Sequence, residues 1–172
     1  MPDLLARVAE KKAEFDRLRP LAPHGLGNLE HVHDLELTYS SNQPRYVLTD
    51  AGRRAFPLPA EVPALMGDLS AWLRAAPSTP ATAFEVHRRL VDIHPFNDGN
   101  GRTARLLMDL LLLRGGYPPV SVRPQDRAAY VASLQEAQSG QGAQTFNRLL
   151  YERLDATLDE YITALNASLP KS

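Results

Sequence analysis

The sequence contains no cysteine among its 172 residues. This absence excludes a disulfide framework and any metal site built on thiolates. An excess of charge of one sign is also lacking, because 19 Lys and Arg residues nearly balance 20 Asp and Glu residues. No basic field therefore indicates binding to nucleic acid. Long apolar runs are missing too, since the leucine-rich segment 106–113 is far too short to span a bilayer. We expect a protein that binds neither nucleic acid nor a membrane.

The first residues show no basic segment followed by an apolar core, so a secretion signal is not expected. We therefore expect a cytoplasmic protein. The hydrophobic share of 44% and the charged share of 23% are those of an ordinary globular chain. The length suits one domain that is large enough to bury a real core.

Apolar residues recur at helical spacing along most of the chain, so the sequence predicts an all-α fold. Thr82, with Glu85 three positions later, is a capping-box signal for a helix that ends near Ile93. One segment, residues 45–56, is instead typical of a small β-hairpin with an Asp/Gly turn. The expected helices cover residues 4–19, 28–39, 62–73, 82–93, 102–114, 124–140 and 143–167.

The stretch from His94 to Arg105 holds the most informative residues, in the order His-Pro-Phe-Asn-Asp-Gly-Asn-Gly-Arg-Thr-Ala-Arg. A loop that opens into a helix is a ready anion site, because its free N–H groups point at the ligand and the helix dipole favours negative charge. Gly99 and Gly101 allow the main chain to approach a phosphate closely. Arg102 and Arg105 occupy neighbouring positions of the first helical turn, where both can reach one polyphosphate.

Two further residues of this stretch suit chemistry at phosphorus. Asp98 is placed to hold a hard cation such as Mg²⁺ beside the phosphates. His94 is the only group here that can take a proton from a hydroxyl near neutral pH. A lone His is more often structural, and an Asp before Gly is usually a turn residue. Those explanations do not cover two arginines beside a glycine turn. The ordered set therefore predicts a nucleotide phosphate site with a general base beside it.

This stretch resembles the signature of the Fic family, which reads His-Pro-Phe, any residue, Asp or Glu, Gly-Asn-Gly-Arg, any two residues, Arg. Every defined position matches. The resemblance covers residues 57–155 and implies an all-α, Fic-type helical bundle with a small β-hairpin flap, folded as a single compact domain. Residues 1–56 would then hold N-terminal helices and the flap, 57–155 the Fic core, and 156–172 the end of the last helix and a tail.

The resemblance implies a protein adenylyltransferase, an enzyme that transfers AMP from ATP to a Ser, Thr or Tyr hydroxyl of a target protein. His94 would deprotonate that hydroxyl, and Asp98 would bind Mg²⁺ between the α- and β-phosphates. Phe96 would anchor the loop as a buried side chain. The residues implied to bind the nucleotide are Asn97, Gly99, Asn100, Gly101, Arg102 and Arg105.

Within this implied nucleotide site, Asn97 would shape the loop, and the Gly-Asn-Gly turn would form an anion hole with Asn100 on the α-phosphate. Arg102 would hold the β-phosphate and Arg105 the γ-phosphate. A related branch of Doc-like kinases has Ala and Lys where this chain has Gly99 and Gly101. The sequence therefore favours AMP transfer over kinase activity.

Family members clamp the target segment by strand pairing on the flap, a role implied here for Arg45, Tyr46, Val47 and Leu48. Many members inhibit themselves through Ser or Thr, three residues, then Glu, and that Glu pairs with the second motif arginine. No Glu in this sequence has Ser or Thr four positions before it, and Arg45 stands where the Glu is expected. Either a separate antitoxin-like protein inhibits the enzyme, or this brake is missing.

Other interpretations stay open at this point. A metal hydrolase would use His24, His31 and His33, but His-x-His on a helix places the two rings on different faces, and no His-Glu-x-x-His is present. The same loop could also transfer UMP or phosphocholine. Alternatively, the chain could be a nucleotide-binding interaction module without catalysis. The sequence does not indicate an oligomeric state.

Overall fold

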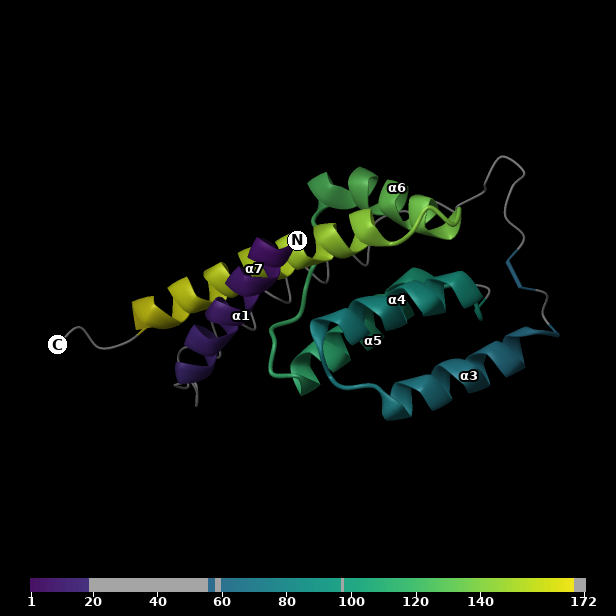
Figure 1. The fold of residues 1–172 in the computed structure, drawn as a ribbon, viewed down its shortest axis with the longest axis horizontal. Coiled ribbons are helices and arrows are strands. Elements are labelled where there is room, and N and C mark those ends of the chain that lie inside the picture. Colours follow the sequence, from purple (N-terminus) through teal and green to yellow (C-terminus); the bar gives the residue numbers. More distant parts are fainter. Residues whose placement is uncertain (19–55, 58–59, 97, 169–172) are drawn as a thin grey trace. The chain divides into compact units, whose positions relative to one another are not determined.

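The computed structural model describes residues 1–18, 56–57, 60–96 and 98–168 (Figure 1). Every regular element within these ranges is a helix, which confirms the expected all-α class. The helix expected at 28–39 and nearly all of the hairpin expected at 45–56 lie outside the described residues. The described helices fall into two compact units, and the domain boundaries expected from the sequence stay a prediction.

The first unit contains α1 (Pro2–Arg17), the short 3-10 helix η1 (Pro124–Asp126), α6 (Arg127–Gln138) and α7 (Gln144–Ser168). Figure 1 shows α1, in purple, lying along α7, in yellow and green. The lysine Nζ of Lys11 lies 2.8 Å from the carboxylate of Asp155 and 2.6 Å from that of Asp159. These ion pairs fix α1 on α7, although the two helices lie far apart in the sequence.

The core of this unit is built on α7. Phe146, Leu150, Leu154 and Leu158 recur every four positions and are all fully buried, the pattern of a helix whose apolar stripe faces a core. Phe15 of α1, which is 1% exposed, meets Tyr161 edge-to-face, with ring centroids 5.9 Å apart. Residues from both α1 and α7 thus close the same core.

The second unit contains α3 (Val62–Ala75), α4 (Pro80–Ile93) and α5 (Asn100–Arg114). Helix α4 is its centre, because it packs against both α3 and α5. Its buried side chains occupy most of two faces, as this sandwiched position requires. Helix α4 therefore determines where the loop that follows it begins.

The start of α4 corrects the capping box expected at Thr82 and Glu85. Thr79 is the N-cap, and its side chain accepts a hydrogen bond from the N–H of Thr82 at 3.3 Å. Pro80 occupies the first helical position, where its fixed φ and missing N–H are tolerated. The helix thus begins three residues earlier, and Thr82 is buried inside it.

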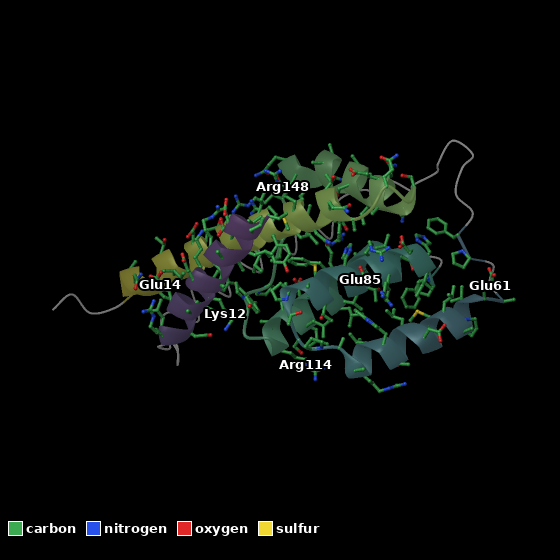
Figure 2. The ribbon with its side chains drawn as sticks, viewed as in Figure 1. Lys12, Glu14, Glu61, Glu85, Arg114 and Arg148 are labelled. Carbon is green, nitrogen blue, oxygen red and sulfur yellow. The ribbon has the colours of Figure 1, made fainter. Side chains whose placement is uncertain are left out.

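An ion-pair network covers the outer side of α4. Glu85 accepts hydrogen bonds from Arg88 at 2.8 Å and from Arg89 at 2.7 Å (Figure 2 labels Glu85). Arg88 also donates to Asp92 at 2.7 Å. The guanidinium of Arg89 lies 4.2 Å from the ring centre of Trp72 on α3, a cation–π contact. The network therefore joins α4 to α3.

None of the helices described here is long and apolar enough to cross a membrane.

Candidate active site

The residues of the motif form the turn between α4 and α5 of the second unit. His94 is the C-cap residue of α4, and its backbone N–H donates to the carbonyl of Leu90 at 3.0 Å. Its φ of 53° and ψ of 53° lie in the left-handed region. No other non-glycine residue in the described ranges has a positive φ. His tolerates this region better than most residues, but backbone strain of this kind concentrates at functional sites.

The imidazole of His94 is half-buried. Its ring stacks on the ring of Phe56, with centroids 4.0 Å apart and 24° between the planes. The Nδ1 atom is buried and has no hydrogen-bond partner in the described part of the chain. Proton transfer to this ring therefore has to use Nε2.

Asn100 closes the turn. Its side-chain Oδ1 accepts the N–H of Phe96 at 2.9 Å, and its Nδ2 donates to the carbonyl of Phe96 at 2.6 Å. The Asn100 residue is 4% exposed, so these bonds are shielded from water and hold the loop against the start of α5. Both polar atoms of the Asn100 amide are bonded to the backbone of Phe96, so we expect a ligand to meet the backbone N–H of Asn100.

The expectation that Phe96 anchors the loop as a buried side chain is wrong. The Phe96 residue is 45% exposed, and the anchored part is its backbone, through Asn100. The side-chain amide of Asn100 holds the main chain of the loop, so the Phe96 ring does not have to be buried to anchor it.

Gly99 sets the direction in which α5 begins. It is the N-cap of α5 with φ 83°, a conformation that costs other residues strain. No side chain of the described residues caps this helix start, and the first bond of the helix runs from the N–H of Thr103 to the carbonyl of Gly99 at 2.8 Å. The amides of the first turn, which precede Thr103, are therefore available to an anion.

Two guanidinium groups turn back toward this glycine turn. A Cβ placed on Gly99 would lie 3.6 Å from Nη2 of Arg102, and one placed on Gly101 would lie 3.5 Å from Nη1 of Arg105. Arg102 also pairs with Oδ2 of Asp98 at 3.1 Å. Positive charge is thus concentrated beside the free amides of α5, as an anion site requires.

Asp98 is tied to the same turn by its other oxygen, since Oδ1 accepts the N–H of Gly99 at 2.6 Å. Its side chain keeps 35% of its surface exposed. Such a carboxylate can serve a hard cation, and Mg²⁺ usually takes only one or two carboxylates beside phosphate oxygens. The described residues contain no group of three or more His, Cys, Asp or Glu that could hold a metal by itself.

His87 is a site residue that the sequence analysis missed. It is fully buried on α4, two helical turns before His94. Burial, assisted by the positive charge of Arg105, lowers the pKa of His87 to about 3. A neutral imidazole therefore lies near the second motif arginine. The sequence does contain a signal for His87, because His87 and His94 are seven positions apart and so share one helical face. Such a spacing is too common to identify a site.

The structure brings together most of the residues expected at the site. All lie on the α4–α5 turn or the first two turns of α5: His94, Asp98, Gly99, Asn100, Gly101, Arg102 and Arg105. Asn97, the expected flap residues Arg45, Tyr46, Val47 and Leu48, and the candidate metal ligands His24, His31 and His33 lie outside the described residues. The inhibitory-segment position at Arg45 is likewise outside them.

Comparison with known proteins gives relatives in sequence. Protein adenylyltransferase Fic from Culex quinquefasciatus is 43% identical over 157 residues, and that from Aedes aegypti is 41% identical over 157 residues. Each match covers 89% of this chain but 30% of the relative. The chain thus spans about a third of the length of these curated relatives.

Solved structures share the fold. A Fic domain containing signaling protein from Bacteroides thetaiotaomicron superposes with a TM-score of 0.81 at 22% identity, over 96% of this chain and 100% of that one. Fic-1 from C. elegans superposes with a TM-score of 0.56 at 37% identity, over 70% of this chain and 36% of that one. The sequence model described as Fic/DOC family matches residues 26–112. With this match over half of its length, and with the motif set on the α4–α5 turn, the chain belongs to the Fic/DOC family.

Proposed function

We propose that this chain is a protein adenylyltransferase, which transfers AMP from ATP to a Ser, Thr or Tyr hydroxyl of a target protein. The observation that carries the proposal is the α4–α5 turn, where one imidazole adjoins a helix start with free amides and two guanidinium groups. The relatives from mosquitoes that match most of this chain are named for the same activity.

In the proposed reaction the target hydroxyl oxygen attacks the α-phosphorus of ATP. A new phosphorus–oxygen bond forms, the bond between the α-phosphorus and the bridging oxygen of the β-phosphate breaks, and pyrophosphate leaves. The hydroxyl proton passes to Nε2 of His94, since Nδ1 is buried. A base placed in hydrogen-bond reach of the hydroxyl typically contributes a rate factor of about 10² to 10⁴.

The proposed nucleotide site uses backbone groups and guanidinium groups for different phosphates. The N–H groups of Asn100 and Gly101 would hold the α-phosphate at the start of α5, where the helix dipole also favours negative charge. Arg102 would hold the β-phosphate and Arg105 the γ-phosphate, with Asn97 shaping the loop. Positioning and charge stabilisation supply most of the catalysis in transfers of this kind.

Asp98 would hold Mg²⁺ in this proposal. Its carboxylate is partly exposed beside the glycine turn, and the nucleotide phosphates and water would supply the remaining ligands. Bound there, the ion would neutralise phosphate charge. Arg102, which pairs with Asp98 in the structure, would then exchange this partner for phosphate oxygens.

Two partners follow from the proposal. One is the target protein, which the segment Arg45 to Leu48 would dock by strand pairing. These 172 residues contain no Ser or Thr four positions before a Glu, so either a separate antitoxin-like protein is the second partner and inhibits the enzyme, or this brake is missing. An inhibitor of this kind would supply an acidic group to Arg105 from outside the chain.

The test is label transfer from ATP labelled at the α-phosphate, with Mg²⁺, in cell lysate and on the purified chain. We expect wild-type protein to label a target, His94→Ala to lower the rate by roughly 10² to 10⁴, and Arg105→Ala to raise the KM for ATP. Arg114→Ala is the matched control, since Arg114 is an exposed arginine in the last turn of the same helix (Figure 2).

Other results would redirect or end the proposal. ATP binding by calorimetry without label transfer would favour a non-catalytic module, and label from UTP or a phosphocholine donor would reassign the transferred group. Absence of both label transfer and ATP binding would contradict the nucleotide site itself.

A further inference from the structure

Phe56 lies against the imidazole of His94, although it belongs to no part of the motif. The ring centroids are 4.0 Å apart and the planes are inclined by 24°, a near-parallel stack that is closer than the usual range for aromatic pairs. Phe56 is half-buried, so its ring has contacts of its own and is not merely a mobile surface group.

The hydrogen bond that the described residues make to His94 fixes its backbone and not the plane of its ring. The N–H of His94 is bonded to Leu90, and its φ of 53° sets the direction of the Cα–Cβ bond. In most sites that use histidine, a carboxylate or carbonyl bonded to the second ring nitrogen sets the ring plane. Among the described residues, Nδ1 of His94 receives no such bond.

The stack supplies what that missing hydrogen bond usually provides. A flat ring at 4.0 Å resists rotation of the imidazole about its Cβ–Cγ bond, because rotation would drive the imidazole edge into the phenyl face. It also covers one face of the imidazole from water. The ring nitrogen left for proton transfer is then Nε2, because Nδ1 is buried.

We propose that Phe56 is a positioning residue, which holds the His94 ring so that Nε2 faces the incoming hydroxyl. The role of His94 in proton transfer rests on the proposed function, whereas the stacking does not. Displacement of a reacting group by about 1 Å can cost roughly a hundredfold in rate. Loss of the stack therefore lowers the rate of the chemical step and leaves nucleotide binding intact.

The kinetic test compares Phe56→Leu with Phe56→Tyr. Leu keeps an apolar side chain but removes the ring plane, and we expect it to lower kcat by roughly ten- to a hundredfold with the KM for ATP unchanged. Phe56→Tyr keeps the ring plane, and we expect it to keep the wild-type kcat. The matched control is Trp72→Leu, which removes an aromatic ring of the same unit that contacts Arg89 instead of His94 and is expected to leave kcat unchanged.

An NMR experiment detects the stacking of Phe56 on His94 independently of enzyme activity. In protein carrying ¹³C-labelled histidine, the His94 ring protons are assigned by their loss in His94→Ala. The phenyl ring current should shift them upfield in wild type and in Phe56→Tyr, and this shift should disappear in Phe56→Leu. Unchanged His94 resonances in Phe56→Leu would overturn the proposal, as would an unchanged kcat. If wild type transfers no AMP, the proposed function fails, and the resonances alone decide whether Phe56 holds the ring.

Discussion

The two histidines of α4 have opposite surroundings. His94 ends the helix and is half-buried, with its Nδ1 atom shielded from solvent. His87 is fully buried, and burial together with Arg105 lowers its pKa to about 3. In the proposed reaction His94 accepts a proton, whereas His87 stays neutral beside the charged Arg105.

The low pKa of His87 predicts loss of stability in acid. Between pH 6.5 and about 3 the unfolded chain binds a proton that the folded chain does not, so the free energy of unfolding falls by about 1.4 kcal/mol per pH unit as the pH is lowered. We expect wild type to lose roughly 2 kcal/mol more than His87→Gln between pH 6 and 4.5. Urea unfolding at several pH values measures this difference. Parallel profiles for the two proteins would show that His87 does not titrate in this way.

At the residue scale, the sequence predicted the candidate site residues but not the contacts that hold them in place. The positions of His94, Asp98 and the two arginines around the glycine turn follow from local spacing. Phe56 was missed because its partner is distant in the sequence and the contact depends on the fold. Phe96 was assigned to the core because it is apolar, yet the amide of Asn100 anchors its backbone instead.

Helix α4 is the element that carries the site, and Glu85 is central to its outer side. Burial tends to raise the pKa of Glu85, but the hydrogen bonds and charges of Arg88 and Arg89 outweigh it and lower that pKa. The carboxylate therefore stabilises α4 when ionised. This contribution is present above the ordinary Glu pKa and is lost as the pH falls through the lowered one.

Replacement of Glu85 tests this network. We expect Glu85→Gln to lower the free energy of unfolding by about 1 kcal/mol at pH 7, because the three charge-assisted hydrogen bonds from Arg88 and Arg89 are weakened at a partly exposed site. The loss should shrink as the pH falls below the ordinary Glu pKa and disappear once the pH is below the lowered pKa of Glu85 in the folded protein. Glu152→Gln is the control, since Glu152 pairs only across one turn with the exposed Arg148, and we expect a change within about 0.5 kcal/mol. Equal losses in both variants would contradict a special role for Glu85.

The sequence predicted where helices lie better than where they begin. The end of α5 at Arg114 lies directly before the glycine pair 115–116 that predicted it, and α7 begins at Gln144, one residue from the expected start at 143. The start of α4 was placed three residues late, because Thr82 and Glu85 imitate a capping box while Thr79 and Pro80 make the actual start. Thr79 and Thr82 are both residues that favour an N-cap, and the structure shows that Thr79 is the one used.

At the scale of the molecule, the first unit is assembled from both ends of the chain and the second from its middle. The described site residues all lie in the second unit. Local patterns predicted each helix of the first unit, but they carry no information about which helices pair. The contact between α1 and α7 joins residues 148 positions apart, so the sequence alone could not indicate it.

The buried ring of Phe15 tests the assembly of the first unit. Phe15→Ala should lower the free energy of unfolding by about 3 to 5 kcal/mol, the usual cost of a buried Phe, because α1 loses its contact with Tyr161. Denaturant unfolding measures this loss. Leu5→Ala is the control on the exposed side of α1 and should change stability by less than about 0.5 kcal/mol. A small effect of Phe15→Ala would show that α1 contributes little to the unit.

The distance along the chain between Lys11 and Asp159 also sets an order of events during synthesis. A ribosome adding about 5 to 20 residues per second needs roughly 7 to 30 s to make the 148 residues that separate them. Throughout that interval α1 lacks its partner, and its apolar face of Leu4, Val8 and Phe15 stays uncovered. Helices α4 and α5, which flank the candidate site, emerge earlier and can pack on one another first. The α4–α5 turn can therefore form before α1 has α7 to pack against. During that interval we expect a chaperone to bind α1, because its apolar face is exposed.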